Sequence, residues 1–416
     1  MSFVTWILVH ALKFILSPIY WFHPNDKNAL DRARTSIRIF FRKLLKSPSR
    51  EMAVPSRESD ELALFRDPQF ALRSHPNFQT QWWYFSGNLQ SSDNRRWEYE
   101  LVFFIRKTGV DFFGFWPMNK MRDQLFISHF SLVDMDGPKE QKNFRYYHRG
   151  GIFSDLHGLA TDSRFNIELD HWTAQQAQDG KIHLSAACEG DSIELELTSL
   201  KNLIYHGENG YSARDQDSRV ASYHCSFTRL ETTGILTARD ESFRVTGLSW
   251  LDHEKMSSHP HRFTWGWDWF SIQLDNNEEL MIYRFHNADG TQDNQFSFGT
   301  VIDSMGISKH LTVEDFQLKE LVYWQSELSG GVYPIHWQIK IFSLDLEIDL
   351  RPHFFDCELN CVSTTFVAYW EGPMWITGSK ATEYLSGRGY LELCGYDRRL
   401  STKLMQFALT PQDLHS

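Results

Sequence analysis

The residues with the clearest chemical potential are Asp252, His253 and Glu254, which are consecutive in the sequence. Two carboxyl groups flanking an imidazole could supply a proton donor and a proton acceptor. In an apolar cavity one carboxyl would stay protonated near neutral pH, because burial disfavours its charged form. Hydration of an alkene needs such an acid, then aromatic faces that stabilise a cation, then water. The alternative is a polar trio that satisfies backbone groups and locks a domain junction.

Strand geometry refines this hypothesis. Alternate residues of a strand face opposite sides, so Asp252 and Glu254 should share a face and His253 should point away. That arrangement favours a carboxylate pair, or a salt-bridged junction, over a concerted triad.

Aromatic residues gather in segments that could wall a ligand site. The candidate ligand-binding residues are Trp82, Trp83, Tyr84, Trp250, Trp267, Asp268, Trp269, Tyr369, Trp370 and Glu371. The alternative role of the tryptophans is to plug the core of a barrel, since their side chains bury a large apolar area. Asp268 and Arg284 are expected to form a buried ion pair across a hairpin, and such pairs specify structure as often as they serve function.

We expect no metal and no cofactor. His253 lies near His259 and His261, which form a His-x-His pair, but the pair falls in a predicted loop and no third ligand is fixed. The five cysteines are scattered and form neither a disulfide framework nor a CxxC site. The sequence contains no nucleophile-elbow, P-loop or Rossmann motif.

The elements that must position these residues are short strands. From about residue 80 onward the chain alternates apolar and polar residues in short runs separated by turns such as Asp136-Gly137. Aromatic hairpins at 81–105 and 266–285 repeat one another, as do the closing segments at 233–252 and 377–393. Closed barrels suit many short strands because closure removes exposed edges. We predict an all-β fold with two tandem β-barrel domains, at 73–255 and 256–416.

The first 50 residues differ from the rest of the chain. Residues 3–22 are largely apolar and long enough, at about 20 residues, to span a bilayer as a helix. Basic residues follow, which favours a cytoplasmic position for that side and contacts with membrane lipids. We expect a membrane-anchoring or membrane-surface helical segment at 1–50 and a linker at 51–72. The expected location is membrane-associated with the body on the cytoplasmic side, and the alternative is periplasmic or secreted.

Charge argues against nucleic acid as a partner. Residues 1–50 carry a net charge of +7, whereas the remainder carries −18. A body this acidic would repel a phosphate backbone.

Four segments together resemble one known family. They read HPNFQTQWWYFSGNL at 75–89, GLSWLDHEKMSS at 247–258, GWDWFSIQLDNNEELMIYRFH at 266–286, and YWEGP at 369–373 with GRGYLELCGY at 387–396. The set is similar to the AttH and carotenoid 1,2-hydratase group. This resemblance implies two lipocalin-like domains, preceded here by the hydrophobic and basic segment, with ligand space in or between the barrels.

The resemblance also implies a kind of chemistry. The group includes pericyclases, and also hydratases that add water to an isoprenoid double bond. The resemblance adds Tyr283 to the catalytic candidates Asp252, His253 and Glu254. Lys255 stands where the hydratases carry Trp, and the strand around Tyr283 lacks their acidic residue. These departures argue against carotenoid hydration itself.

Two functional hypotheses follow. In the first, the protein binds a hydrophobic, lipid- or isoprenoid-like small molecule and catalyses its acid-assisted hydration, isomerisation or cyclisation. In the second, it is a non-enzymatic lipid carrier or an accessory protein of an export transporter.

Overall fold

The computed structural model of the 416-residue chain describes residues 56, 60–107, 112–113, 116–117, 124–138, 143–150, 156, 158–216, 220–257, 264–287, 291–361 and 368–397. The predicted helical segment at 1–50 and the His259/His261 pair lie outside these residues. Within the described ranges, no helix is long and apolar enough to cross a membrane.

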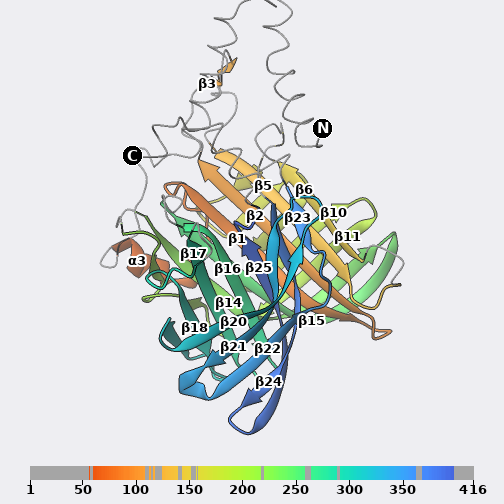
Figure 1. Cartoon of the computed structure of the whole chain (residues 1–416). Helices are drawn as coiled ribbons and strands as arrows, with labels where there is room; N and C mark the ends of the chain where they lie inside the picture. Colours follow the sequence, from red (N-terminus) through yellow and green to blue (C-terminus); the bar gives the residue numbers. More distant parts are fainter. Residues whose placement is uncertain are drawn as a thin grey trace, which may run out of the picture.

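The first unit is a curled antiparallel sheet (Figure 1). Its strands pair in the order β6-β5-β2-β1-β15-β14-β11-β10-β9-β8-β7, and β12 and β13 add to β14. The bounds are β1 Thr80–Ser91, β2 Arg96–Lys107, β5 Gln124–Asp134, β6 Phe144–Gly150, β7 Gly158–Ala160, β8 Asn166–Leu169, β9 Trp172–Gln176, β10 Ile182–Cys188, β11 Asp191–Ser199, β12 Ile204–Tyr205, β13 Tyr211–Ala213, β14 Ala221–Ala238 and β15 Glu241–Met256. A separate two-stranded pair is formed by β3 Phe112–Phe113 and β4 Trp116–Pro117.

The second unit is a smaller sheet of the same design, in the order β19-β18-β17-β16-β25-β24-β22-β21-β20, with β23 added to β24. The bounds are β16 Thr264–Leu274, β17 Glu279–Asn287, β18 Phe298–Ile302, β19 Ser308–Thr312, β20 Phe316–Gln325, β21 Val332–Ile341, β22 Leu346–Pro352, β23 Glu358–Asn360, β24 Ala368–Lys380 and β25 Glu383–Cys394, with a 3-10 turn η1 at Phe342–Leu344.

The two sheets repeat one topology. Strand β1 lies between β2 and β15 in the first sheet, and β16 lies between β17 and β25 in the second. The long hairpins β14–β15 and β24–β25 close the two units in the same way. The predicted all-β fold with two lipocalin-like units is confirmed, although the strand pairing of the described residues makes each unit a curled half-barrel.

Strand alternation produces three clusters of buried apolar side chains. Each sheet encloses a core of its own. A third cluster lies between the sheets and combines Tyr84, Val102 and Trp250 with Trp269, Met281, Tyr283, Phe285 and Phe298. Strands β1, β2, β15, β16 and β17 therefore carry buried apolar side chains on both faces.

Two short helices, α3 Asp60–Phe65 and α4 Pro68–Ala71, lie within the stretch 51–72 that the sequence suggested as a linker. Leu62 and Phe65, three residues apart, belong to the core of the first sheet, and so does Ala71. This part of the stretch packs on the first unit because Leu62 and Phe65 fall on one face of α3.

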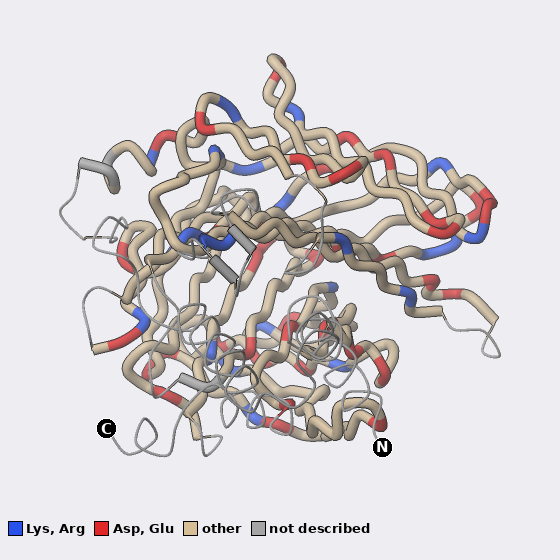
Figure 2. The backbone as a smooth tube through the Cα atoms, turned by 90° about the horizontal axis from the view of Figure 1, so that it is seen from above, with Lys and Arg blue, Asp and Glu red and all other residues tan. Residues whose placement is uncertain are grey.

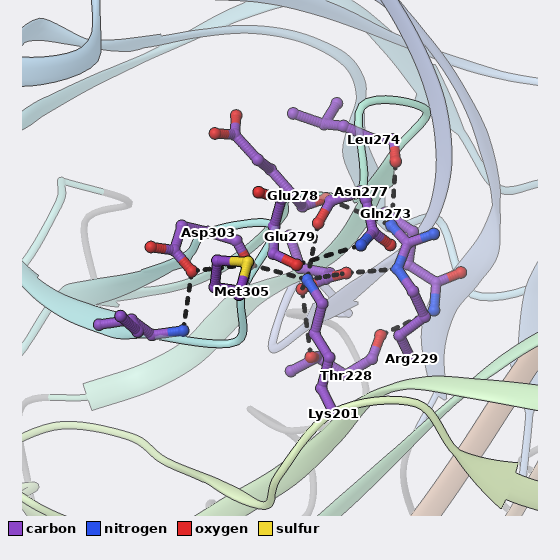
Figure 3. A network of polar contacts seen from close by, with 12 residues as sticks. Lys201, Thr228, Arg229, Gln273, Leu274, Asn277, Glu278, Glu279, Asp303 and Met305 are labelled. Atoms are coloured by element: carbon purple, nitrogen blue, oxygen red, sulfur yellow. Dashed lines mark hydrogen bonds and ion pairs between the residues drawn. The ribbon is translucent and has the colours of Figure 1, made fainter.

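A buried ionic cluster joins the two units (Figure 3). The Lys201 ammonium, from the first unit, donates to both carboxylate oxygens of Glu279 at 3.0 and 2.7 Å and to the backbone carbonyl of Asp303 at 2.8 Å. Arg229 donates to the same carboxylate and, at 2.9 Å, to the carbonyl of Leu274. A register shift in β14 between Phe227 and Leu230 accompanies this contact, as bulges re-aim side chains.

Acidic and basic residues are interspersed over the loops and strand ends of the described chain (Figure 2). Charged residues of both signs thus mix along the described chain. The ionic cluster around Glu279 is buried, with the Lys201 and Glu279 side chains 4% and 0% exposed.

Candidate functional site

Asp252 lies on the face of β15 that turns towards the second sheet. Its carboxylate oxygens lie 2.7 and 2.8 Å from Nε2 of His224, and the Ser226 hydroxyl donates to Oδ1. The register of the β14–β15 hairpin places Ser226 directly opposite Asp252 and His224 opposite Glu254, so all four share one face. His253 is on the other face of the strand.

A relay of hydrogen bonds reaches Asp252 from the second unit. Nε2 of His206 lies 2.8 Å from the Ser226 hydroxyl, and its Nδ1 lies 3.0 Å from the Thr300 hydroxyl on β18. Because Ser226 uses its proton on Asp252, His206 must donate through Nε2 and accept from Thr300 through Nδ1. The chain therefore runs in one direction, from Thr300 to His206 to Ser226 to Asp252.

A tight turn positions His206. The amide of Gly210 donates to the His206 carbonyl at 2.9 Å, and Gly207, Asn209 and Gly210 all have positive φ. A side chain at Gly207 would come within 2.4 Å of the Tyr211 carbonyl oxygen, so glycine is required there. The Glu208-Asn-Gly sequence, which predicts a turn, thus places an imidazole over β14.

Glu254 is paired rather than free. Arg214 donates to Oε1 of Glu254 and, through Nε, to the Ser222 hydroxyl at 3.0 Å. The Arg214 guanidinium also lies over the ring of Tyr283, with its central carbon 4.3 Å from the ring centroid. Glu254 therefore serves as the counterion of a buried arginine and is a poor candidate for a base.

Burial sets the protonation states of this cluster. It raises the pKa of Asp252 to about 6, against the opposing effect of its hydrogen bond from Ser226. It lowers the pKa of His224 to about 4 and that of His206 well below its usual value. At neutral pH both imidazoles are neutral, and Asp252 is the group that exchanges a proton close to physiological pH.

Several predicted site residues lie on the core side of the sheets instead. His253 stacks on Trp83 with ring centroids 4.4 Å apart, and its Nδ1 lies 2.7 Å from the Trp82 carbonyl oxygen. Trp370 is buried in the second core and donates to the Phe355 carbonyl at 2.7 Å. The alternation of side chains along a strand explains these positions. His253 is adjacent in sequence to Asp252, and Trp370 to Glu371, and in each pair the second residue faces the space between the sheets.

Asp268 also lies on the core side, in the ion pair predicted from the sequence. Nη1 of Arg284 donates to its Oδ2 at 2.8 Å, and the Tyr396 hydroxyl donates to its Oδ1 at 2.8 Å. This pair fixes the β16–β17 hairpin and does not face the space between the sheets.

The other predicted aromatics meet between the sheets. The Tyr84 and Trp269 rings make an edge contact at 5.1 Å, and Trp250 meets Trp269 at 6.2 Å. Trp82 and Trp267 pack against this cluster, and Tyr283 is part of it. His224 contacts the Tyr283 ring at 6.2 Å, so the Asp252 network adjoins the aromatic cluster.

A second polar group occupies the same interface. The Tyr369 hydroxyl lies 2.5 Å from Nδ1 of His129 on β5, which joins β24 to the first sheet. Glu371 faces the same side as Tyr369 and is 2% exposed. Burial and the neighbouring carboxyls of Glu100 and Glu392 raise its pKa well above the ordinary value.

The sequence hypotheses missed the residues that surround Asp252 and Glu371. The main ones are Glu100, His129, His206, Arg214, His224, Ser226, Tyr390 and Glu392. Strand pairing could have found His224 and Ser226, because they stand opposite the predicted acids once β14 is paired with β15. His206 and Arg214 come from loops, and no local pattern indicates where their side chains lie.

One set of side chains has the composition of a metal site. His206, His224 and Asp252 bring one ligand atom each within 4.8 Å of one another, a combination that zinc uses in other proteins. A metal bound through Nε2 of both imidazoles would need these atoms unprotonated, whereas the relay requires a proton on Nε2 of His206. The described geometry therefore fits a hydrogen-bond network better than a metal centre.

The part of the chain that the structure describes contains a small cavity and a larger, open one. One, between the sheets, has a volume of about 10 Å3, room for about one water molecule, and is lined by residues that include Ser86, Trp250, Ser271 and Tyr390. The other, of about 590 Å3, is open to solvent near the turns at Glu189 and Asp240 and contains none of the predicted site residues.

Two curled β-sheets with an aromatic and acidic interface define an all-β protein of the double lipocalin-like class. A model of the AttH-like family matches residues 65–396, and the chain belongs to this family. No curated protein matches the chain.

Solved structures agree with this assignment. The chain is similar to a putative AttH from Nitrosomonas europaea, at 25% identity and a TM-score of 0.69, over 83% of this chain and 99% of that one. It also shares its fold with kievitone hydratase from Nectria haematococca, at 12% identity and a TM-score of 0.59, over 85% of this chain and 96% of that one.

Proposed function

We propose that the protein binds a hydrophobic small molecule between its two sheets and transfers a proton to it from Asp252. Acid-assisted hydration, isomerisation and cyclisation all begin with this step. The observation that supports the proposal is the buried Asp252 carboxyl, held by His224 and Ser226 beside an aromatic cluster, with a pKa raised to about 6. A carboxyl with this pKa can deliver a proton near neutral pH and recover it from water.

The surroundings suit a cationic intermediate. The faces of Tyr283 and its aromatic neighbours already accept the Arg214 guanidinium, with 4.3 Å between its central carbon and the Tyr283 centroid. Positive charge on a protonated ligand would be stabilised in the same way by other rings of this cluster, such as Trp250 and Trp269. Binding requires side chains of the interface to move apart, because the cavity there has a volume of about 10 Å3. Kievitone hydratase, whose fold this chain shares, is by name a hydratase, which is compatible with the proposal.

The test uses deuterium. The full-length protein is incubated in D2O with an apolar extract of its own cells, and the extracted compounds are followed by mass spectrometry. Proton transfer to carbon should introduce deuterium into one compound, and hydration should also add the mass of one water. Asp252→Asn should abolish the incorporation while the circular dichroism spectrum is unchanged.

The matched control is Asp349→Asn, because Asp349 also pairs with a histidine, His336, at 2.9 Å on β21 and β22. This control should retain full incorporation. A compound that binds but emerges unchanged from the wild-type protein would contradict the proposal and favour the lipid carrier. Unfolding of Asp252→Asn alone would assign Asp252 to the domain junction.

A further inference from the structure

Four buried residues at the interface between the sheets have polar side-chain atoms that make no hydrogen bond of good geometry with the described residues. They are Tyr84, Glu100, Glu371 and Tyr390, from β1, β2, β24 and β25. The atoms without a hydrogen bond of good geometry are both hydroxyls, both oxygens of Glu100 and Oε1 of Glu371, and only weaker polar contacts link Tyr84 with Glu371 and Glu100 with Ser131. All four residues are at most 5% exposed. Native proteins leave few such atoms, because each costs about 1–3 kcal/mol when buried alone.

These atoms belong to one cluster that spans both sheets. Burial, then the carboxyls of Glu371 and Glu100, raise the pKa of Tyr84 well above its usual value. Burial is also the main cause of the raised pKa of Tyr390, and Glu371 and Glu100 contribute again. Glu371 stands opposite Glu392 across the β24–β25 pair, so these carboxyls crowd the same face.

The cluster is rich in hydrogen-bond donors. Carboxyls this deeply buried and this close together keep their protons, since a second negative charge would be repelled. Each neutral carboxyl then offers an O–H, as do the two tyrosines. A protonated carboxyl and a tyrosine in an apolar site are a known means of binding the oxygen of a carbonyl or enolate.

Apolar surface and space adjoin the donors. The Tyr84 ring contacts Trp269 at 5.1 Å, and Tyr390 lines the cavity of about 10 Å3 between the sheets, next to Trp250. A cavity of this volume has room for about one water molecule, or for one oxygen group of a ligand. A ligand with a hydrocarbon body and one oxygen would place the body among the aromatics and the oxygen at the donors.

We propose that Tyr84, Glu100, Glu371 and Tyr390 form a binding site for the carbonyl or hydroxyl oxygen of an apolar ligand. The proposal rests on the proposed function and narrows it, because a pure hydrocarbon would leave these donors unpaired. A site built to hydrogen-bond an oxygen rejects the analogue that lacks it.

The test compares two probes of nearly the same shape, 2-naphthol and naphthalene, by equilibrium dialysis against the full-length protein. We expect 2-naphthol to bind about tenfold more tightly, which corresponds to one or two additional hydrogen bonds. The double variant Tyr84→Phe/Tyr390→Phe should lose this preference and bind both probes equally. Tyr384→Phe, at a tyrosine that is 72% exposed, should keep it.

Thermal unfolding separates a binding role from a structural one. Since the two hydroxyls have no partner of good geometry, their removal should leave the melting temperature unchanged or raise it. A large fall would show that they support the fold and would overturn the proposal.

Other outcomes distinguish this proposal from the proposed function. Equal binding of both probes to the wild-type protein would overturn the oxygen site and leave apolar binding intact. A preference that survives in the double variant would overturn the assignment to these tyrosines. Binding of neither probe would contradict both.

Discussion

The Thr300 hydroxyl of the second unit lies 3.0 Å from Nδ1 of His206 in the first, so the second sheet orients an imidazole that acts on Asp252 through Ser226. All of these residues are at most 3% exposed. In such a low-dielectric environment successive hydrogen bonds strengthen one another. The protonation of Asp252 therefore depends on how the two units are docked.

This coupling can be measured as a double-mutant cycle of Thr300→Val and Ser226→Ala. Each change should cost about 1–3 kcal/mol of unfolding free energy, because it leaves a buried ring nitrogen of His206 without its hydrogen-bond partner. The two effects should be non-additive by at least about 0.5 kcal/mol, since both act on the same imidazole. Urea unfolding of the four proteins gives the coupling energy. Strict additivity would show that the relay is not an energetic unit.

The ionic cluster in Figure 3 predicts a strong effect of Glu279→Gln. Glu279 balances Lys201 and Arg229, whose side chains are 4% and 8% exposed, and its loss leaves two buried cations without a counterion. We expect a loss of about 3–5 kcal/mol in unfolding free energy, as for other broken buried pairs. Glu347→Gln is the matched control, because Glu347 pairs with Lys340 at 2.9 Å while 47% exposed. This control should change stability by less than about 1 kcal/mol, and equal losses in both variants would contradict the role of burial.

The sequence predicted the fold well because its information is local and repeated. Period-two alternation identifies the strands, and the WWYFS and WDWFS hairpins, at 82–86 and 267–271, reveal the duplication. The same alternation predicts that Asp252 and Glu254 share a face. It also shows why His253 and Trp370 were poorer candidates for the site. Each is adjacent in sequence to a residue that faces the space between the sheets, so its own side chain points into the core of a sheet.

The site was harder to predict because it depends on pairing between distant segments. Arg214 reaches Glu254 across 40 residues of sequence, and His129 reaches Tyr369 across 240. The sequence also does not show which strands are buried on both faces. Glu100 looks like the polar side of an alternating strand, yet the second sheet covers that side and leaves it 0% exposed.

The raised pKa of Glu100 predicts a dependence of stability on pH. Burial raises this pKa from 4.5 to about 8, so between these values the folded protein keeps a proton that the unfolded chain loses. The contribution is fully present below about pH 4.5 and is lost as the pH rises towards 8, by at most about 1.4 kcal/mol per pH unit. Glu100→Gln mimics the neutral carboxyl, so its stability relative to the wild type should increase over this range. Urea unfolding at several pH values measures the difference, and Glu231→Gln, at an exposed position, should show none. A constant difference for Glu100→Gln would mean that Glu100 is ionised in the folded protein.

The hydrogen-bond relay predicts how the protein responds to chelators. If Nε2 of His206 carries a proton, the set of His206, His224 and Asp252 is satisfied without an ion. Treatment with EDTA should therefore leave the melting temperature unchanged, and elemental analysis of the purified full-length protein should show no stoichiometric zinc. Zinc added in excess should compete with the proton and bind more weakly as the pH falls. His224→Gln serves as the control, because it removes one ligand and should weaken any zinc binding at this set. A melting temperature that falls with EDTA and recovers with zinc in the wild type, but not in His224→Gln, would replace the relay with a metal centre and would make Asp252 a ligand rather than a proton donor.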